Sequence, residues 1–191
     1  KKVLQAAQST VALIKTRDIT KGEKDSVLES KAFGSSYGLC KTEPYYDQPL
    51  AAFCSGFYVG DDTFVTAGHC IVSQSSCEST SFVFGFSIDK QGQDPTTVPN
   101  SEVYQCKTLV KQFKDTFGAD YAVMKVDRKV KNHKALKVRR SGRIQKGAEL
   151  YVIGHPAGLP KKVAGNASVR EISNEHFNAN LDTYGGNSGS A

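Results

Sequence analysis

Three separate segments of the chain supply side chains that can together make a hydroxyl group reactive. His69 follows a short apolar run, Asp120 opens the apolar run 120–126, and Ser188 lies among small residues. A serine hydroxyl is a weak nucleophile at neutral pH, and it becomes reactive when an imidazole takes its proton and a carboxylate orients that imidazole. These residue types predict acyl transfer, with Ser188 as nucleophile, His69 as general base and Asp120 as the orienting carboxylate.

Each of the three residues, taken alone, also fits a structural role. A single histidine is often a core or surface residue, an aspartate after Gly118-Ala119 fits a turn, and Gly-Asn-Ser-Gly is a good turn sequence. Asp115 and Asp127 compete with Asp120, but neither opens a comparable strand. The catalytic interpretation therefore rests on all three residues together.

The small residues around Ser188 predict a site for a negatively charged oxygen. With Gly186 two residues before it, the backbone N–H groups of Gly186 and Ser188 can converge on one point. Such a pair forms an oxyanion hole, where the loss of one donor typically costs about 2.7–4 kcal/mol of transition-state stabilisation. Glycine suits this loop because a side chain would block the substrate or the required backbone torsion.

Three motifs in this order resemble those of the chymotrypsin-fold, trypsin-like serine proteases. They are residues 66–70 (Thr-Ala-Gly-His-Cys), 120–122 (Asp-Tyr-Ala) and 186–189 (Gly-Asn-Ser-Gly). Residues 152–156 and 182–190 resemble bacterial secreted members more closely, near the glutamyl endopeptidase branch. The resemblance covers about residues 50–191. It implies two antiparallel six-stranded β-barrels with the catalytic cleft between them, and peptide-bond hydrolysis through an acyl-enzyme.

The elements that must position these residues are short strands. From about residue 50 onward, apolar or alternating runs are separated by Gly, Asp, Asn and Pro, a pattern typical of antiparallel sandwiches and barrels. Residues 3–14 fit a helix or a strand equally well. We expect an all-β protein of two chymotrypsin-like barrels, the second incomplete because the chain stops three residues after Ser188.

The basic segment near residue 130 predicts how the chain is divided. From Lys125 to Lys146 there are ten Lys or Arg and one acid, which suits a solvated connector. The expected parts are an N-terminal segment (1–30), a first barrel with His69 and Asp120 (31–128), a basic connector (129–143) and a second barrel (144–191).

Asp182 and Thr183, six and five residues before Ser188, bear on the choice of substrate. Asp182 matches the position where trypsin-like enzymes place the acid that binds Arg or Lys. Thr183 matches the position where the glutamyl branch places a hydroxyl that helps to bind Glu. A buried carboxylate would repel an acidic side chain, so the two interpretations exclude each other only if Asp182 faces the pocket. Both residues remain candidate substrate-binding residues.

The five cysteines favour disulfides over metal binding. A Cys54–Cys70 bridge would clamp the turn that carries His69, and closing such a loop contributes about 3 kcal/mol in the chain-entropy model. The three others allow three pairings, of which we choose Cys77 with Cys106, and this leaves Cys40 without an assigned partner. The alternative is free thiols in a cytosolic protein. No paired C-x-x-C spacing suggests a metal site. Disulfides predict a secreted or periplasmic protein.

The remaining composition narrows the partners. The net charge is +6, but the basic segment lacks interleaved aromatics and any nucleic-acid-binding motif. No stretch approaches the roughly 20 apolar residues of a membrane span. We therefore expect no nucleic acid and no membrane, and no sequence feature indicates a cofactor. The resemblance to proteases implies a protein or peptide substrate. A separate C-terminal fragment of the same protein is left open as a partner.

Two other functions compete with a serine endopeptidase. A protease-like barrel can serve as a catalytically inactive binding module, and intact His69, Asp120 and Ser188 argue against it. The same triad can also act on non-peptide acyl groups, as in an esterase.

Overall fold

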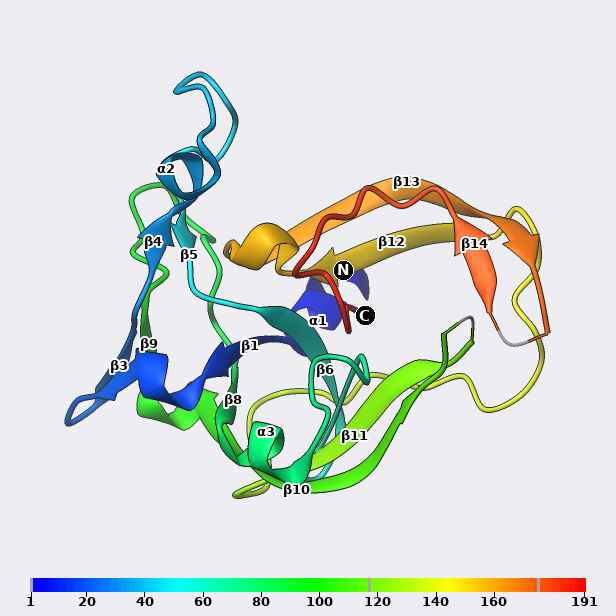
Figure 1. The fold of residues 1–191 in the computed structure, drawn as a ribbon, viewed down its shortest axis with the longest axis horizontal. Helices are drawn as coiled ribbons and strands as arrows, with labels where there is room; N and C mark the ends of the chain where they lie inside the picture. The colour runs from blue at the N-terminus through cyan, green and yellow to red at the C-terminus, as the bar shows by residue number, and fades with distance from the viewer. Residues whose placement is uncertain (1, 117, 175) are drawn as a thin grey trace.

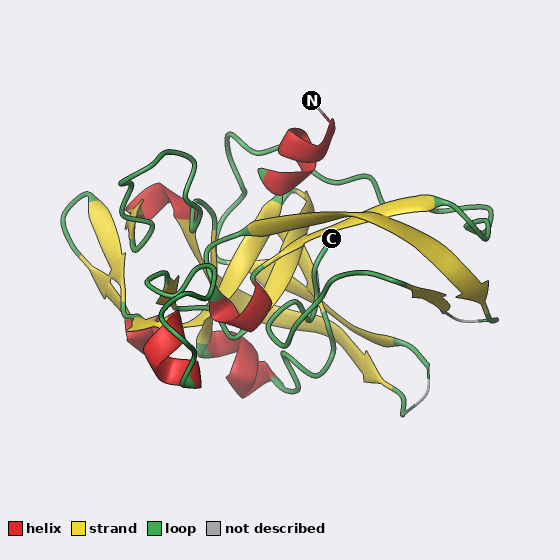
Figure 2. Cartoon of the chain, turned by 90° about the horizontal axis from the view of Figure 1, so that it is seen from above, coloured by secondary structure: helices red, strands yellow, loops and turns green. Residues whose placement is uncertain are grey.

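The structure is a computed structural model that describes residues 2–116, 118–174 and 176–191. Strands dominate (Figure 1), and the helices are short (Figure 2). The helices are α1 (Lys2–Ala7), α2 (Phe33–Tyr37) and α3 (Gln74–Glu78), with the 3-10 turns η1 (Thr16–Asp18), η2 (Asn100–Glu102) and η3 (Pro156–Gly158). Within the described ranges, no helix has the length and apolar character needed to cross a membrane.

Six antiparallel strands close into a barrel in the order β1-β6-β7-β11-β10-β8 (Figure 1). They are β1 (Thr10–Lys15), β6 (Cys54–Gly60), β7 (Thr63–Thr66), β8 (Thr80–Val83), β10 (Val103–Lys114) and β11 (Asp120–Val126). Every second residue of β7 is buried, as in a strand with one face on a core. Inside, the fully buried Phe64 stacks on Phe82 with ring centroids 4.9 Å apart. A closed six-stranded barrel in a mostly β protein is therefore confirmed.

Strand β1 shows why the N-terminal residues fit two patterns. Residues 3–14 divide into α1 and most of β1, with a turn between them. Val11 and Leu13 pack in the barrel core, while Ala12 and Ile14 pack in a second cluster on the other side of the strand. A strand buried on both faces lacks the alternation that identifies strands in a sequence. The barrel thus takes one strand from before residue 31.

Smaller sheets flank the barrel. The second cluster lies beneath the three-stranded sheet β2 (Ile19–Lys21), β3 (Asp25–Leu28) and β9 (Thr97–Pro99). Strands β4 (Lys31–Ala32) and β5 (Pro49–Leu50) form a short ribbon beside α2 (Figure 1).

Residues 144–191 form an open antiparallel sheet in the order β12-β13-β14, which arches over the barrel in Figure 1. Its strands are β12 (Glu149–Gly154), β13 (Lys162–Ile172) and β14 (Phe177–Ala179). The three strands do not close on themselves, so the second barrel stays a prediction. Residues 129–143, the expected connector, contain neither helix nor strand.

Polar contacts join these parts. In the connector, His133 hydrogen-bonds the Gln8 carbonyl through Nδ1 at 2.7 Å and the Glu102 carboxylate through Nε2 at 2.7 Å. Its ring stacks on Phe84 at 3.7 Å. Lys161 lies directly before β13, and its Nζ donates a hydrogen bond to the Ala7 carbonyl at 2.6 Å. Burial lowers the pKa of the Lys161 ammonium group to about 8. The N-terminal segment is therefore fixed to both the connector and the second half.

Two disulfides are present, Cys54–Cys70 and Cys77–Cys106, and both pairings agree with the expectation from the sequence. The first joins the start of β6 to the turn after β7. The second joins α3 to β10. Cys40 is exposed and has no disulfide partner among the described residues.

Removing the Cys77–Cys106 bridge is expected to destabilise the protein. Closing a loop with a sequence separation of 29 contributes about 3.5 kcal/mol in the chain-entropy model. The double substitution Cys77→Ala, Cys106→Ala should therefore lower the free energy of unfolding in urea by about that amount. Cys40→Ala is the control and should leave it unchanged. An unchanged midpoint in the double variant would contradict this role.

Candidate active site

The pairing of β7 with β11 sets His69 beside Asp120. Thr66 lies opposite Ala122 at the end of this antiparallel pair, so the turn two residues after Thr66 lies close to residue 120, two residues before Ala122. His69 Nδ1 lies 2.5 Å from one carboxylate oxygen of Asp120, and its backbone N–H donates to the other at 2.9 Å. The pairing of the two strands thus places His69 where the Asp120 carboxylate binds both its side chain and its backbone N–H.

Gly68 allows this close approach. A Cβ at this position would lie 2.2 Å from the Phe113 carbonyl oxygen and 2.9 Å from the Asp120 carboxylate. Real Cβ atoms do not approach so closely, so the turn before His69 accepts only glycine without a backbone shift. The small residue in the turn is therefore required by the β10–β11 pair behind it.

The Asp120 carboxylate favours its charged form. Partial burial opposes ionisation, but hydrogen bonds from the side chain and backbone of His69, and from Gly68, together lower the pKa of this carboxyl group. An ionised carboxylate only accepts hydrogen bonds, so Nδ1 of His69 carries the proton between them. In the neutral ring, Nε2 is then left as an acceptor, which is the tautomer of a general base.

The loop 185–190 packs against the first barrel. The backbone N–H of Ser55, on β6, donates to the Ser188 carbonyl at 2.9 Å. Gly189 adopts φ +81°, and a Cβ there would lie 2.2 Å from the Thr66 hydroxyl and 2.3 Å from the Ser55 carbonyl. This position needs glycine for both its torsion and its space. The loop can therefore sit directly on β6 and the end of β7.

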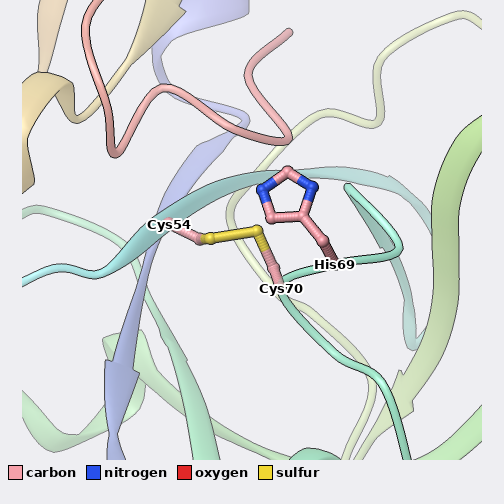
Figure 3. Close-up of side chains that lie close together, drawn as sticks. All are labelled: Cys54, His69 and Cys70. Atoms are coloured by element: carbon pink, nitrogen blue, oxygen red, sulfur yellow. A yellow bond between two sulfur atoms is a disulfide. The ribbon is translucent and has the colours of Figure 1, made fainter. Parts of the chain in front are cut away.

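This contact brings the backbone of Ser188 to the turn that carries His69. Its carbonyl oxygen lies 3.8 Å from Sγ of Cys70, the neighbour of His69. Figure 3 shows the imidazole beside the Cys54–Cys70 bridge, with the C-terminal segment in faint red close by. Among the described residues, no hydrogen bond joins the Ser188 hydroxyl to the ring. The link between nucleophile and base remains a prediction.

Two backbone N–H groups in the loop are oriented by their own peptide carbonyls. The Gly185 carbonyl accepts from Ala157 N–H at 2.5 Å, and the Asn187 carbonyl accepts from Ser190 N–H at 2.8 Å. In a trans peptide the N–H points opposite to the C=O. The N–H groups of Gly186 and Ser188 thus point away from these partners, and within the described ranges neither donates to a protein acceptor. Both are free to bind a ligand oxygen.

Ser55 and the turn at η3 are parts of this site that the sequence reasoning missed. Ser55 is fully buried, and its hydroxyl donates to the Gly186 carbonyl at 2.8 Å. Ala157, in η3, has a positive φ of 54°, and its backbone N–H donates a hydrogen bond to the Gly185 carbonyl. A single polar residue after Cys54 and one alanine after His-Pro carry no spacing signal, so only the three-dimensional contacts identify them.

His155 is a buried structural histidine. Its Nδ1–H donates to the Leu159 carbonyl at 3.0 Å, while Nε2 has no partner among the described residues. Burial, with a smaller effect of the nearby Lys161 charge, lowers the pKa of its imidazole to about 3. The ring is therefore neutral at neutral pH, and its bond to Leu159 joins the two residues that flank the η3 turn.

Asp182 and Thr183, the candidate substrate-binding residues, are both exposed. Asp182 lines a cavity of about 240 Å³ together with Val152, Tyr184 and Asn187. No contact in the described residues assigns either side chain to a substrate, so their roles stay predictions.

A cluster of metal-ligand residue types surrounds His69 but cannot bind a metal. The ligand atoms of Cys54, His69 and Cys70 lie within 4.8 Å of one another (Figure 3). Both sulfurs are joined in a disulfide, and metal binding to cysteine requires a thiolate. This cluster therefore clamps the histidine turn and offers a single ligand atom.

Comparisons with known proteins show the family and the fold. Residues 54–191 match the family model described as "Trypsin-like peptidase domain". The chain is similar to the active form of the Rv3671c protease from M. tuberculosis, with a TM-score of 0.54 at 14% identity over 98% of this chain and 66% of that chain. The inactive form gives a TM-score of 0.53 at 16% identity over 98% and 72%.

A Glu endopeptidase in complex with MPD is also similar, with a TM-score of 0.53 at 19% identity over 72% of this chain and 66% of that chain. At such identities the likeness shows the fold alone, and the chain spans about two thirds of the length of these proteins. The search of curated proteins found no match.

The buried His155 predicts a loss of stability in acid. Its pKa falls from the ordinary 6.5 to about 3 on folding, so between these values the unfolded chain binds more protons. The free energy of unfolding should therefore decrease as pH falls from 6.5 towards 3, by up to about 1.4 kcal/mol per pH unit.

His155→Gln, which does not titrate and keeps a donor for Leu159, should flatten this dependence in urea titrations at several pH values. His176→Gln alters an exposed histidine and is the matched control. If His155→Gln and the unmodified protein lost stability with the same slope, His155 would not be the acid-sensitive group.

Proposed function

The chain belongs to the trypsin-like peptidase domain family, and from this we propose that it is a serine endopeptidase with His69, Asp120 and Ser188 as its catalytic triad. One observation carries the proposal. Asp120 holds His69 at Nδ1 and at its backbone N–H, on the turn whose neighbour Cys70 contacts the Ser188 carbonyl. A histidine oriented by a carboxylate in this way supports its proposed role as the base that takes the proton of the Ser188 hydroxyl.

The proposed reaction proceeds in two acyl transfers. Ser188 Oγ attacks the peptide carbonyl carbon while its proton moves to Nε2 of His69. The carbonyl oxygen becomes an oxyanion that accepts hydrogen bonds from the N–H groups of Gly186 and Ser188. The C–N bond then breaks, His69 gives its proton to the leaving amine, and an ester to Ser188 remains. Water, deprotonated by His69, releases the acid and restores the serine.

Asp120 supports both proton transfers. Its carboxylate keeps the proton on Nδ1, so Nε2 is free to accept one from the nucleophile. When the ring becomes a cation, the adjacent negative charge stabilises it. The lowered pKa of Asp120 keeps this charge in place at neutral pH.

The proposed cleft lies between the first barrel, which residues 31–128 form together with β1 from the segment 1–30, and the second half (144–191), and the connector 129–143 links the two. His69 and Asp120 come from the barrel, and Ser188 comes from the segment after β14. Backbone bonds between Ile153 and Ala191, at 3.1 and 3.3 Å, support the attachment of this segment to β12.

The two disulfides support a location in an oxidising compartment, and we propose a secreted or periplasmic bacterial enzyme acting on protein or peptide substrates. An esterase would use the same residues, and a catalytically inactive binding module would not need them in this arrangement. The peptidase family favours the endopeptidase over both.

Covalent labelling tests the triad. A fluorophosphonate should attach to Ser188, because only an activated serine attacks phosphorus at a useful rate, and peptide mapping by mass spectrometry locates the adduct. His69→Ala should slow labelling by at least about 1000-fold, because it removes the base. His176→Ala is the control and should label like the unmodified protein. Attachment at another residue, or labelling that survives His69→Ala, would exclude this triad.

Substrate charge tests the roles of Asp182 and Thr183. Because a carboxylate in the pocket attracts Arg or Lys and repels Glu, we expect kcat/KM to favour one charge class by at least about tenfold. If basic substrates are preferred, Asp182→Asn should lower the ratio of kcat/KM for basic substrates to kcat/KM for Glu substrates. If Glu substrates are preferred, Thr183→Ala should lower the preference for Glu. Equal rates on matched Arg, Lys and Glu peptides, unaffected by either substitution, would remove both residues from the pocket.

A further inference from the structure

Ser55 occupies an unusual position for a buried serine. It lies on β6 directly after Cys54, and none of its surface is exposed to solvent. Its backbone N–H donates to the Ser188 carbonyl at 2.9 Å, and its carbonyl accepts from the Thr66 hydroxyl at 2.6 Å. The backbone of this residue already joins the barrel to the nucleophile loop, which leaves its hydroxyl for a separate task.

The hydroxyl of Ser55 links two backbone groups of the second half. It accepts a hydrogen bond from His155 N–H at 2.8 Å and donates to the Gly186 carbonyl at 2.8 Å. An amide N–H can only donate and a carbonyl can only accept, so the direction of the hydroxyl proton is fixed. The side chain therefore holds Gly186 in one orientation relative to the η3 turn.

Gly186 needs such a restraint. It has φ +92°. The peptide group between residues 185 and 186 contains the Gly186 N–H, and the peptide group between residues 186 and 187 contains the Gly186 carbonyl. Ala157 N–H holds the plane of the first group through the Gly185 carbonyl, and Ser55 Oγ holds that of the second. Because glycine adopts positive and negative φ about equally well, the N–H could turn away if either plane were released.

We propose that Ser55 is a positioning residue for the oxyanion hole, whose hydroxyl keeps the Gly186 N–H aimed at the developing oxyanion. This rests on the proposed endopeptidase activity and adds to it a residue outside the triad. Ser55 touches neither substrate nor reacting atoms. It acts through Gly186, so its removal should weaken binding of the transition state more than binding of the substrate.

The surroundings of Ser55 make its replacement by alanine informative. The space between Gly154 and Ser55 Oγ is occupied by other side chains, because a Cβ on Gly154 would lie 1.9 Å from Ser190 Oγ, 2.6 Å from Asn187 Oδ1 and 2.9 Å from Ser55 Oγ. Deleting one oxygen leaves little room for a water molecule to take over its two hydrogen bonds. The His155 N–H and the Gly186 carbonyl would then both lack their partner.

The test compares Ser55→Ala with Ser26→Ala on the same peptide substrate. Ser26 is also a buried serine, 2% exposed, and its hydroxyl donates to Asn100 Oδ1 at 2.7 Å in the β2-β3-β9 sheet. Thermal unfolding is measured first, and kinetics are run well below the lowest Tm. A peptide aldehyde, whose adduct with serine bears an oxygen in the oxyanion hole, reports on the hole directly.

For Ser55→Ala we expect kcat to fall by about 10- to 100-fold and aldehyde binding to weaken by a similar factor, with KM within about threefold of the unmodified value. Ser26→Ala should change none of these values.

Three results would overturn the proposal. They are kcat and aldehyde affinity of Ser55→Ala close to the unmodified values, the same losses in Ser26→Ala, and failure of Ser55→Ala to fold while Ser26→Ala folds, which would make the hydroxyl a folding residue. If the unmodified protein neither cleaves peptides nor reacts with a fluorophosphonate, the proposed function itself fails, which is a separate outcome.

Discussion

The hydrogen bond from Ser55 N–H to the Ser188 carbonyl is the contact on which the whole site depends. It joins β6 of the first barrel to the loop 185–190, more than 120 residues further along the chain. A backbone bond of this kind is insensitive to the side chains at either end, but it requires that the two chains come very close. Gly189 provides that closeness, because any Cβ there would overlap the Thr66 hydroxyl and the Ser55 carbonyl. The loop 185–190 is therefore held by main-chain geometry.

On the other side of this contact, the barrel holds His69 with little freedom. The β7–β11 register, the Cys54–Cys70 bridge and the absence of a side chain at Gly68 all act on the same turn. Each restraint comes from a different part of the chain. His69 is therefore held in place by rigid strands and one disulfide, which is the preorganisation that the proposed role as a general base requires.

Local patterns predicted part of this arrangement well. The alternation in β7 and β11 and the small residues around Ser188 are visible in the sequence, and the two disulfides agree with the pairs expected from it, although the choice of Cys77 with Cys106 was one of three. Strand β1 was ambiguous because both of its faces are buried, against two different clusters. Ser55 was missed because one serine in an apolar strand has no signature until Gly186 and His155 are placed beside it. The sheet formed by residues 144–191 depends on pairings that no short motif encodes.

The most direct test of the account is a crystal structure of the protein with a peptide aldehyde bound. With the proposed triad and oxyanion hole, we expect a covalent bond from Ser188 Oγ to the carbon of the aldehyde group. The oxygen on this carbon should lie about 2.7–3.1 Å from the backbone N atoms of Gly186 and Ser188. His69 Nε2 should lie within hydrogen-bonding distance of the adduct while Nδ1 remains on Asp120. An adduct oxygen that points away from both N–H groups, or a His69 ring out of reach of Ser188, would contradict the account.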